Sequence, residues 1–175
     1  IQGEMLSIED IGKIRKKVIW TFHDGWPFCG SEHLPNGLHD KRYVEGYLTK
    51  NRNPNHTGLD LDKYAWERKR KSWSKKNLIV CPSNWLKSCV VQSELMSSWP
   101  VHTIPHALPV DIYKPLQKNI AREILNFPKD KKLVLFGALN PTKDKNKGWE
   151  ILKLALKKLS KNISSIEAIV FGTSE

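Results

Sequence analysis

Cysteine and long apolar runs are both scarce in this chain of 175 residues. Its three cysteines, Cys29, Cys81 and Cys89, follow no regular spacing, and an odd number argues against a disulfide framework. We therefore expect a reducing, cytoplasmic environment. No apolar run is long enough to span a bilayer, so contact with a membrane would have to be peripheral and made through a charged surface.

Acidic residues are the second deficit, with 18 Asp and Glu against 29 Lys and Arg, which gives a net charge of +11. Much of the positive charge falls in three clusters, at residues 68–76, 129–132 and 143–147. Such an excess favours anionic partners, namely nucleic acid, an anionic membrane surface or a phosphorylated small molecule. A solvated basic face is the ordinary alternative. The chain has no helix-turn-helix, zinc-finger or RNP pattern, which argues against nucleic acid.

Several motifs of catalytic and metal sites are absent as well. The chain contains no G-x-S-x-G segment, and its lysine-rich loop lacks the glycine spacing of a P-loop. One group of cysteine and histidine residues matches no zinc-ligand spacing, so we expect no metal site there. Its members are Cys29, His33, His39 and His56.

Asp60-Leu61-Asp62 fits the D-x-D pattern with which many sugar-nucleotide enzymes hold a divalent metal. Here, however, the pattern stands where a helix is predicted to begin. Aspartate is favoured at and just inside helix starts, so we predict that it caps that helix. Ser7 and Ser83 are predicted to cap two other helices in the same way.

Strand-like and helix-like segments alternate along the whole chain, which predicts an α/β fold with parallel sheets. Residues 29–58 show no periodicity and are predicted to form a long loop. The proline-rich segment 105–115 is typical of a connection between two domains, expected at residues 1–110 and 111–175. We expect strands at 18–22, 77–81, 100–104, 133–138 and 166–171, and helices at 7–17, 61–76, 83–96, 116–126 and 148–161.

The apolar patterns of these segments predict how they pack. The strand at 133–138 is a continuous apolar run, of the kind that is buried on both faces in parallel sheets. Trp85 shares helical spacing with Leu86 and Cys89, so we expect it in the core. The helix at 148–161 is amphipathic, and its predicted inward residues are Ile151, Leu152, Leu154, Ala155 and Leu159.

A short apolar strand leads directly to His23. The turn residues Asp24-Gly25 and Pro27 end the strand, so the histidine is predicted at its carboxyl end. Ligands of open α/β sheets bind beyond the carboxyl ends of the strands, which makes His23 a candidate acid/base or phosphate-contacting group. The alternative is a histidine that only completes the hydrogen bonding of a turn.

A second candidate is the loop at residues 140–148, which brings lysines to the amino end of the last predicted helix. Free backbone N–H groups at a helix start and adjacent ammonium groups both favour anions. A solvated lysine turn is the alternative. Ser83 stands at a similar helix start, where capping is its first role and contact with a ligand is a second.

An ordered set of segments resembles the retaining glycosyltransferases of family 4. The resemblance begins with Trp20-Thr21-Phe22-His23-Asp24-Gly25-Trp26-Pro27-Phe28-Cys29-Gly30, similar to the family's TxHDxWxFxG segment. It continues in family order over nearly the whole chain, through residues 66–69, 79–86, 104–105, 111–115, 135–138, 147–148 and 171–172.

The resemblance implies the GT-B architecture, in which two Rossmann-like domains face each other across a cleft. Such enzymes transfer a sugar from a nucleotide-sugar donor to an acceptor with retention, and they need no bound metal. Residues 1–110 would be the later part of the acceptor domain, and residues 111–175 the beginning of the donor domain. We therefore expect a fragment truncated at both ends, which is inactive by itself.

The resemblance also implies roles for single residues. His23 matches the family histidine at the cleft and is the expected catalytic residue. Lys147 matches the lysine that holds the donor diphosphate, and further donor-binding residues are Gly137 and Lys143. The residues expected on the acceptor side or along the cleft are Asp24, Trp26 and Ser83.

The chain departs from the family pattern in three places. Ala138-Leu139 stands where an arginine is common, and Asn146 precedes the lysine where the family often has arginine. His106-Ala107 replaces the Asn-Gly of the linker. The role of the family arginine is therefore open, and Lys143 or Lys145 could take it.

The implied function is glycosyl transfer to a glycan or lipid-linked acceptor in cell-surface polysaccharide biosynthesis. The nucleotide-sugar is a substrate, so no cofactor is expected, and peripheral contact with the inner face of an anionic membrane would suit a lipid-linked acceptor. The composition leaves open a different reading, a basic module that binds nucleic acid or anionic membranes without catalysis.

Overall fold

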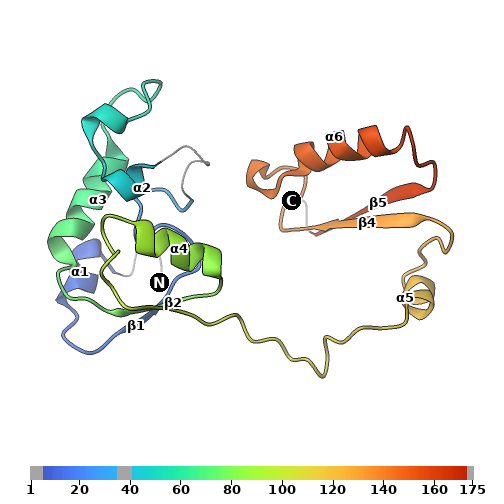
Figure 1. The fold of residues 1–175 in the computed structure, drawn as a ribbon, viewed down its shortest axis with the longest axis horizontal. Helices are drawn as coiled ribbons and strands as arrows, with labels where there is room; N and C mark the ends of the chain where they lie inside the picture. Colours follow the sequence, from blue (N-terminus) through green and yellow to red (C-terminus); the bar gives the residue numbers. More distant parts are fainter. Residues whose placement is uncertain (1–5, 35–40, 173–175) are drawn as a thin grey trace. The chain divides into compact units, whose positions relative to one another are not determined.

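The computed structural model describes residues 6–34 and 41–172 (Figure 1). The chain is α/β, as predicted, with two small parallel sheets. It divides into two compact units, Ile1–Leu108 and Pro109–Glu175, each with one of the sheets. Among the described helices, none combines the length and the apolar character that crossing a membrane requires.

The first unit holds a three-stranded sheet in the order β1-β2-β3, with every pair parallel. Trp20, Ile79 and Val101 are neighbours across it. All three strands and the main helices lie where the alternating pattern predicted them, although most are shorter. The elements are α1 (Ile8–Lys13), β1 (Ile19–Thr21), α2 (Arg42–Glu45), the 3-10 helix η1 (Thr49–Asn51), α3 (Leu61–Ser72), β2 (Leu78–Cys81), α4 (Asn84–Gln92) and β3 (Val101–Thr103).

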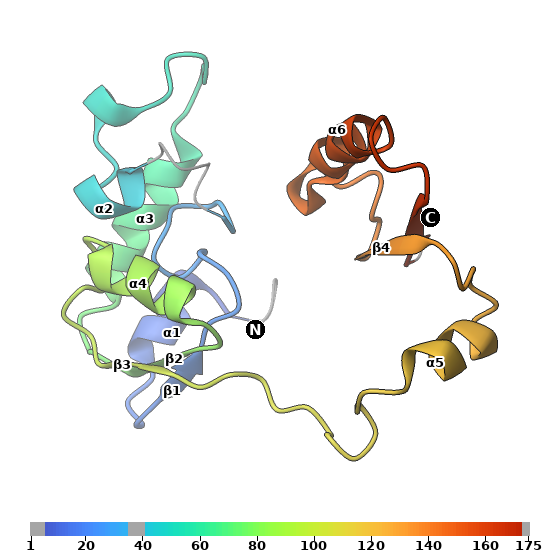
Figure 2. The ribbon, with the colours of Figure 1, turned by 45° about the vertical axis from the view of Figure 1, so that its right-hand side comes forward.

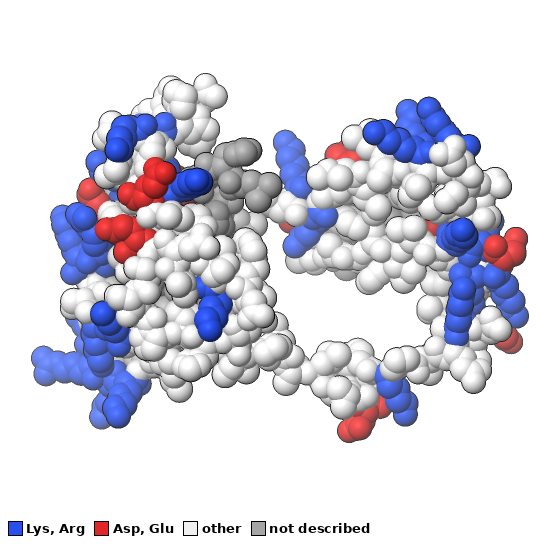
Figure 3. Space-filling view, viewed as in Figure 1, with Lys and Arg blue, Asp and Glu red and all other residues white. Residues whose placement is uncertain are grey.

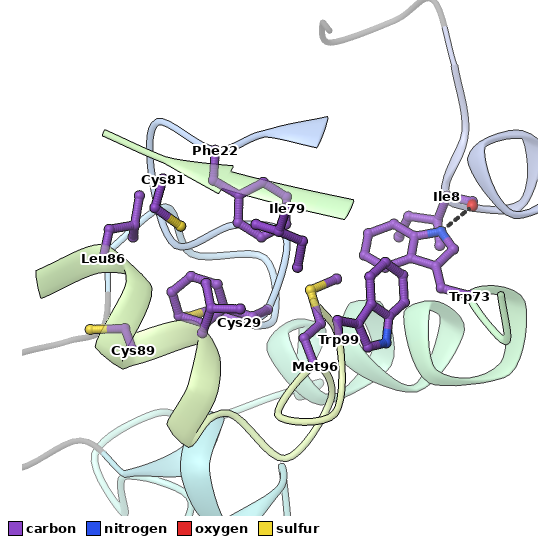
Figure 4. Packing of buried hydrophobic residues seen from close by; sticks show 12 residues of the cluster. Ile8, Phe22, Cys29, Trp73, Ile79, Cys81, Leu86, Cys89, Met96 and Trp99 are labelled. Carbon is purple, nitrogen blue, oxygen red and sulfur yellow. Dashed lines mark hydrogen bonds between the residues drawn. The ribbon is translucent and has the colours of Figure 1, made fainter. Parts of the chain in front are cut away.

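The core of this unit lies between one face of the sheet and the helices α3 and α4, which both lie on that side (Figures 1 and 2). Sequential parallel strands joined by right-handed crossovers place both helices on the same face. Figure 4 shows the packing, with the Trp73 indole N–H donating to the carbonyl of Ile8 at 2.7 Å. The labelled core residues are Ile8, Phe22, Cys29, Trp73, Ile79, Cys81, Leu86, Cys89, Met96 and Trp99.

The opposite face of the sheet is more open. Ile19 is 69% exposed, and Thr21 and His102 are exposed as well. The first strand is therefore half-buried, because its side chains alternate between the helix-covered face and the open face. The cysteines Cys29, Cys81 and Cys89 are free and buried.

The predicted long loop at 29–58 contains two short helices, α2 and η1, within the part that the structure describes. Side-chain hydrogen bonds hold this segment in place, although its sequence has no periodic apolar pattern. The Arg42 guanidinium donates to the Asp60 carboxylate at 2.7 and 3.3 Å, and to Asn51 Oδ1 at 3.3 Å. Helices of three and four residues are too short to carry a periodic pattern, which is why the sequence did not predict them.

The second unit contains a βαβ arrangement around a two-stranded parallel sheet. Its register runs from Lys132 opposite Ile166 to Gly137 opposite Phe171. The elements are α5 (Lys118–Ile124), β4 (Lys132–Gly137), the 3-10 helix η2 (Lys145–Lys147), α6 (Trp149–Leu159) and β5 (Ile166–Phe171).

Two packing predictions for this unit are wrong. Leu135 on β4 is 58% exposed, so the strand is not buried on both faces. Of the residues predicted to face inward from α6, only Leu152 is half-buried, while Ile151 and Leu154 are 76% and 61% exposed. The contact of α6 with the sheet is made instead by Trp149, whose ring centroid lies 5.5 Å from that of Phe136. The single helix α6 packs on the two described strands β4 and β5, and one helix cannot cover both faces of that sheet.

The three predicted N-caps are confirmed. The Ser7 hydroxyl accepts from the amide of Asp10 at 3.1 Å, and the Ser83 hydroxyl accepts from the amide of Leu86 at 3.2 Å. Asp60 caps α3 by accepting from the amide of Lys63 at 3.0 Å. The D-x-D segment is therefore a helix start, and Asp60 is tied to Arg42 as well.

Burial opposes the charge of Asp60, but the Arg42 guanidinium and the Lys63 amide keep the pKa of its carboxyl below the usual range. Replacing Asp60 with alanine removes the cap and the carboxylate with which the buried Arg42 guanidinium pairs. We expect Asp60→Ala to lower the free energy of unfolding by about 2–4 kcal/mol in urea denaturation. Because the carboxyl pKa is lowered on folding, the Asp60 contribution should be present at neutral pH and disappear as the pH falls.

Asp60→Asn is the matched control, since an asparagine keeps the cap but loses the ion pair. It should lose less stability than Asp60→Ala. Equal stability in the wild type and both variants would contradict the structural role of Asp60.

Candidate functional site

Two histidines stack at the carboxyl edge of the first sheet. The amide of Phe22 still pairs with the carbonyl of Val80 at 2.9 Å, and His23 follows as an exposed residue. The amide of Ile104 pairs with the carbonyl of Cys81 at 2.9 Å, and His106 follows two residues later. The rings of His23 and His106 are 5.0 Å apart between centroids and within 7° of parallel.

This arrangement requires the chain segments after two non-adjacent strands to converge. β1 and β3 lie on opposite sides of β2, about 10 Å apart in a flat sheet. The stacking of His23 on His106 therefore brings the two segments together beyond the end of β2. The sequence had marked His106 only as a departure from the family pattern. Its place three residues after a strand was the signal that could have identified it.

The stacked rings suit hydrogen bonding better than metal chelation. The nitrogen lone pairs of an imidazole lie in the ring plane, and parallel planes do not converge on one ion. Among residues 6–34 and 41–172, no three His, Cys, Asp or Glu side chains form a group that could hold a metal. His39, which belonged to the cysteine–histidine group of the sequence, lies outside the described residues. The pair can instead offer two imidazoles to one bound polar molecule.

The loop after β1 closes on itself beside His23. The Asp24 carboxylate pairs with Nδ1 of His33 at 2.7 Å and accepts from the amide of Trp26 at 3.0 Å. The amide of Gly25 donates to the carbonyl of His33 at 2.7 Å. Asp24 directly follows His23 in the chain, so the Asp24–His33 pair belongs to the same strand end. Trp26 is half-buried and packs against Trp73, with ring centroids 6.0 Å apart.

Ser83 is exposed at the carboxyl end of β2, and its hydroxyl serves as the cap of α4. Beside it, Oδ1 of Asn84 accepts from the Thr103 hydroxyl at 2.9 Å and joins α4 to the end of β3. Trp85 follows and is 60% exposed, so its predicted place in the core is wrong. The buried face of α4 runs through Leu86, Cys89 and Val90, and Trp85 lies off that face.

The second unit has a hollow of about 400 Å³ at the segment between β4 and α6. The side chains around it belong to Leu139, Asn140, Lys143, Asp144 and Lys147. It therefore brings together two of the predicted donor-binding residues, Lys143 and Lys147. Gly137 is not among the lining residues; a Cβ there would lie 2.1 Å from the Phe171 ring, which accounts for the glycine by packing.

Two features of the hollow favour an anion, its lysines and the start of α6 nearby. The two lysines outnumber Asp144, whose carboxylate lies 4.0 Å from Nζ of Lys147 and also accepts from the amide of Asn146 at 2.9 Å. Oδ1 of Asn140 is buried without a hydrogen-bond partner among the described residues, and as an acceptor it calls for a donor and does not itself favour an anion. The helix α6 begins at Trp149, two residues after Lys147, and its N-cap Gly148, with φ +77°, provides no side-chain acceptor for the first amides.

The basic cluster at residues 68–76 is largely used inside the first unit. Arg68 makes two hydrogen bonds to Glu9, at 2.6 and 2.8 Å, and these bonds lower the pKa of that carboxyl to about 2. Nζ of Lys75 donates to the carbonyls of Arg15 and Lys16 at 2.9 and 2.6 Å. Lys69 is completely buried. Figure 3 shows basic side chains gathered over the edge formed by α1 and α3, but several of them have internal partners.

Comparison with protein-family models, with curated proteins and with solved structures found no match to this chain.

The stacked histidines can be tested by NMR. In a stack, each ring shields the protons of the other, so His106→Ala should move the His23 ring-proton resonances downfield. The ¹H–¹³C spectrum of the histidine side chains measures this shift. His102→Ala, on the exposed side of β3, is the control and should leave His23 unchanged. Identical His23 resonances in all three proteins would contradict the stack.

Proposed function

We propose that this chain forms part of a retaining glycosyltransferase of the GT-B type, which transfers a sugar from a nucleotide-sugar to a glycan or lipid-linked acceptor. The observation that carries the proposal is the hollow lined by Lys143 and Lys147 at the start of α6. The second unit supplies the donor-binding residues, and the first unit supplies the acceptor-side residues around His23. Cell-surface polysaccharide biosynthesis is the process that this chemistry would serve.

The hollow matches what a donor diphosphate needs. Phosphate oxygens accept charge-assisted hydrogen bonds from ammonium groups, and the unpaired amides at a helix start add further donors. A volume of about 400 Å³ is within the range of small-molecule sites. Asn140, with φ +49°, holds the turn that begins this segment and lines the hollow itself. These groups are in place before the ligand binds.

The same groups would assist the reaction as well as binding. When the bond between the sugar and the diphosphate breaks, negative charge develops on the leaving nucleoside diphosphate. Lysines and amide dipoles aimed at that charge stabilise the transition state more than the ground state. No metal ion is required for this role, in agreement with the assignment of Asp60 as a helix cap.

The first unit would bind the acceptor at the carboxyl edge of its sheet. His23 is exposed there, next to the Asp24–His33 pair and stacked on His106. An imidazole at this place can donate to or accept from a sugar hydroxyl and can move a proton near neutral pH. Ser83 and Asn84, at the end of β2, add polar groups to the same edge.

The competing reading, a basic module that binds nucleic acid or anionic membranes, has less support from the side chains. Its strongest element was the cluster at residues 68–76. Within that cluster Arg68, Lys69 and Lys75 are engaged by Glu9 or by backbone carbonyls, so they contribute little to a binding surface.

The donor proposal is tested by titrating the chain with UDP, GDP and dTDP in calorimetry. Lys147→Ala should weaken binding of the preferred nucleotide by about ten- to a hundred-fold, because one charge-assisted hydrogen bond is worth about 1.5–3 kcal/mol. Lys157→Ala, on the last turn of α6, is the matched control and should bind like the wild type. Asp144→Asn keeps the turn acceptor and removes the one acidic side chain that lines the hollow among the described residues, so it should bind more tightly.

Equal affinities of the wild type and Lys147→Ala would remove the hollow as a donor site. Binding of pyrophosphate with the same affinity as the nucleotide would restrict the site to phosphate alone and contradict a nucleotide-sugar donor.

The acceptor-side role of His23 is tested by activity in the intact protein. We expect His23→Ala to lower sugar transfer, measured as release of nucleoside diphosphate from the nucleotide-sugar, by about 10²–10⁴-fold if it moves a proton. His102→Ala removes a histidine from the same sheet and should retain activity. Near-normal transfer by a folded His23→Ala protein would assign the histidine to the turn only.

A further inference from the structure

A lysine is buried at the centre of the first unit. Lys69 of α3 has no exposed surface, and its ammonium donates to three backbone carbonyls, those of Trp26, Cys29 and Gly30, at 3.0 Å for Cys29 and 2.5 Å for Gly30. Nζ also lies 4.0 Å from the centre of the Trp26 ring and 5.8 Å from that of Trp73. The sequence placed Lys69 in a basic cluster and did not predict that it is buried.

The loop needs a donor at this point. Its first part is a tight turn, in which the amides of Phe28 and Cys29 donate to the carbonyl of Gly25 at 3.1 and 2.9 Å. The carbonyls of Trp26, Cys29 and Gly30 converge on the ammonium. A buried carbonyl without a donor is costly, and an ammonium has three N–H groups, as many as the carbonyls it meets.

Two opposing effects act on the charge of the Lys69 ammonium. Burial lowers the pKa of its ammonium to about 7, while Cys29, Glu32, Asp24 and Asp62 favour the charged form. Cys29, Glu32 and Asp24 lie in the loop, and Asp62 lies in the first turn of α3. A charge buried at this depth is retained only where its partners are well placed.

The rest of the loop is attached to the start of the same helix and to Tyr47. The amide of Ser31 donates to the Asp62 carboxylate at 3.3 Å, and the amide of Gly30 donates to the Tyr47 hydroxyl at 2.8 Å. A Cβ at Gly30 would lie 2.5 Å from the carbonyl oxygen of Asp62, so the loop packs directly on the start of α3. The loop is thus held by Lys69 and, at Gly30 and Ser31, by Tyr47 and the start of α3. Asp24 and His33 lie at its two ends.

We propose that Lys69 is a positioning residue, whose ammonium holds residues 24–33 in place and so sets the Asp24–His33 pair beside His23. Its ammonium contacts the loop and two tryptophan rings, so Lys69 would act on the edge of the sheet through the loop. An effect of Lys69 on sugar transfer rests on the proposed function, whereas its effect on the position of the loop does not.

The test compares Lys69→Met with Lys71→Met. Methionine keeps most of the volume of the side chain and removes the donors, and Lys71 is exposed on the same helix. In amide hydrogen exchange, Lys69→Met should lose about ten- to a hundred-fold of protection at residues 25–33, while the amides of β2 keep theirs. The His33 ring resonances should move in the same variant. Lys71→Met should match the wild type in both measurements.

An equal loss of protection in the loop and in β2 would mean that Lys69 only stabilises the whole unit, and the proposal would be wrong. Unchanged loop protection in Lys69→Met would also overturn it.

A measurement on the wild type covers the case in which Lys69→Met does not fold. The Lys69 ammonium protons should exchange slowly with water at pH 6 and show contacts to the Trp26 ring in NMR. With fluorotryptophan in place, the Trp26 ¹⁹F resonance should titrate with a midpoint near pH 7. Ammonium protons that exchange as fast as those of exposed lysines would contradict the buried contact.

The two proposals remain separable. Lys69→Met should bind UDP like the wild type, because Lys143 and Lys147 belong to the other unit. In the intact protein it should lower sugar transfer. Failure of UDP to bind any variant would remove the donor proposal and leave the loop result untouched.

Discussion

Parallel strand pairing is the constraint on which both units depend. Strands that run in the same direction cannot be joined by a tight turn, so each connection must cross over and includes a helix. All carboxyl ends then lie at the same edge of the sheet, and the segments that follow them meet there. In the first unit His23, Ser83 and His106 each follow one of the three strands at this edge, and the two histidines stack there. In the second unit the segment after β4 carries the lysines of the hollow to the start of α6.

Basic side chains also hold loops in place inside both units. Lys69 donates to three carbonyls of the loop after β1. Arg122 of α5 donates to the carbonyls of Pro128, Lys129 and Lys131, and closes the turn before β4. In each case a long basic side chain provides several donors to the carbonyls of a segment outside the strands and helices. Part of the net charge of +11 therefore stabilises loops and is unavailable to an anionic partner.

The local features of the fold were predictable because they arise from neighbouring residues. Helix starts at Ser7, Asp60 and Ser83 depend on a side chain and an amide three residues away, and all three caps are present. Strands such as β2 and β5 were visible as short apolar runs. Burial was less predictable. Trp85 and Ile151 are apolar residues on amphipathic helices, yet both are exposed, because burial depends on what packs against the helix.

Some residues of the candidate site were likewise predictable from the sequence, and others were not. His23, Lys143 and Lys147 were predicted from their places after strands and before a helix, and the structure places the two lysines around one hollow. His106 and Lys69 were not identified as site residues. His106 becomes relevant only when the segments after β1 and β3 converge. Lys69 becomes relevant only when a loop about 40 residues earlier in the chain folds over it.

The sequence by itself determined the alternation of strands and helices, the caps and the chemical types available at each strand end, since these follow from short-range patterns of side chains. Tertiary structure alone decided which charges are buried, which histidines stack and which strand faces remain exposed. These properties depend on residues far apart in the chain, and the free energy of a buried ammonium or of a stacked pair exists only once both sides are in place.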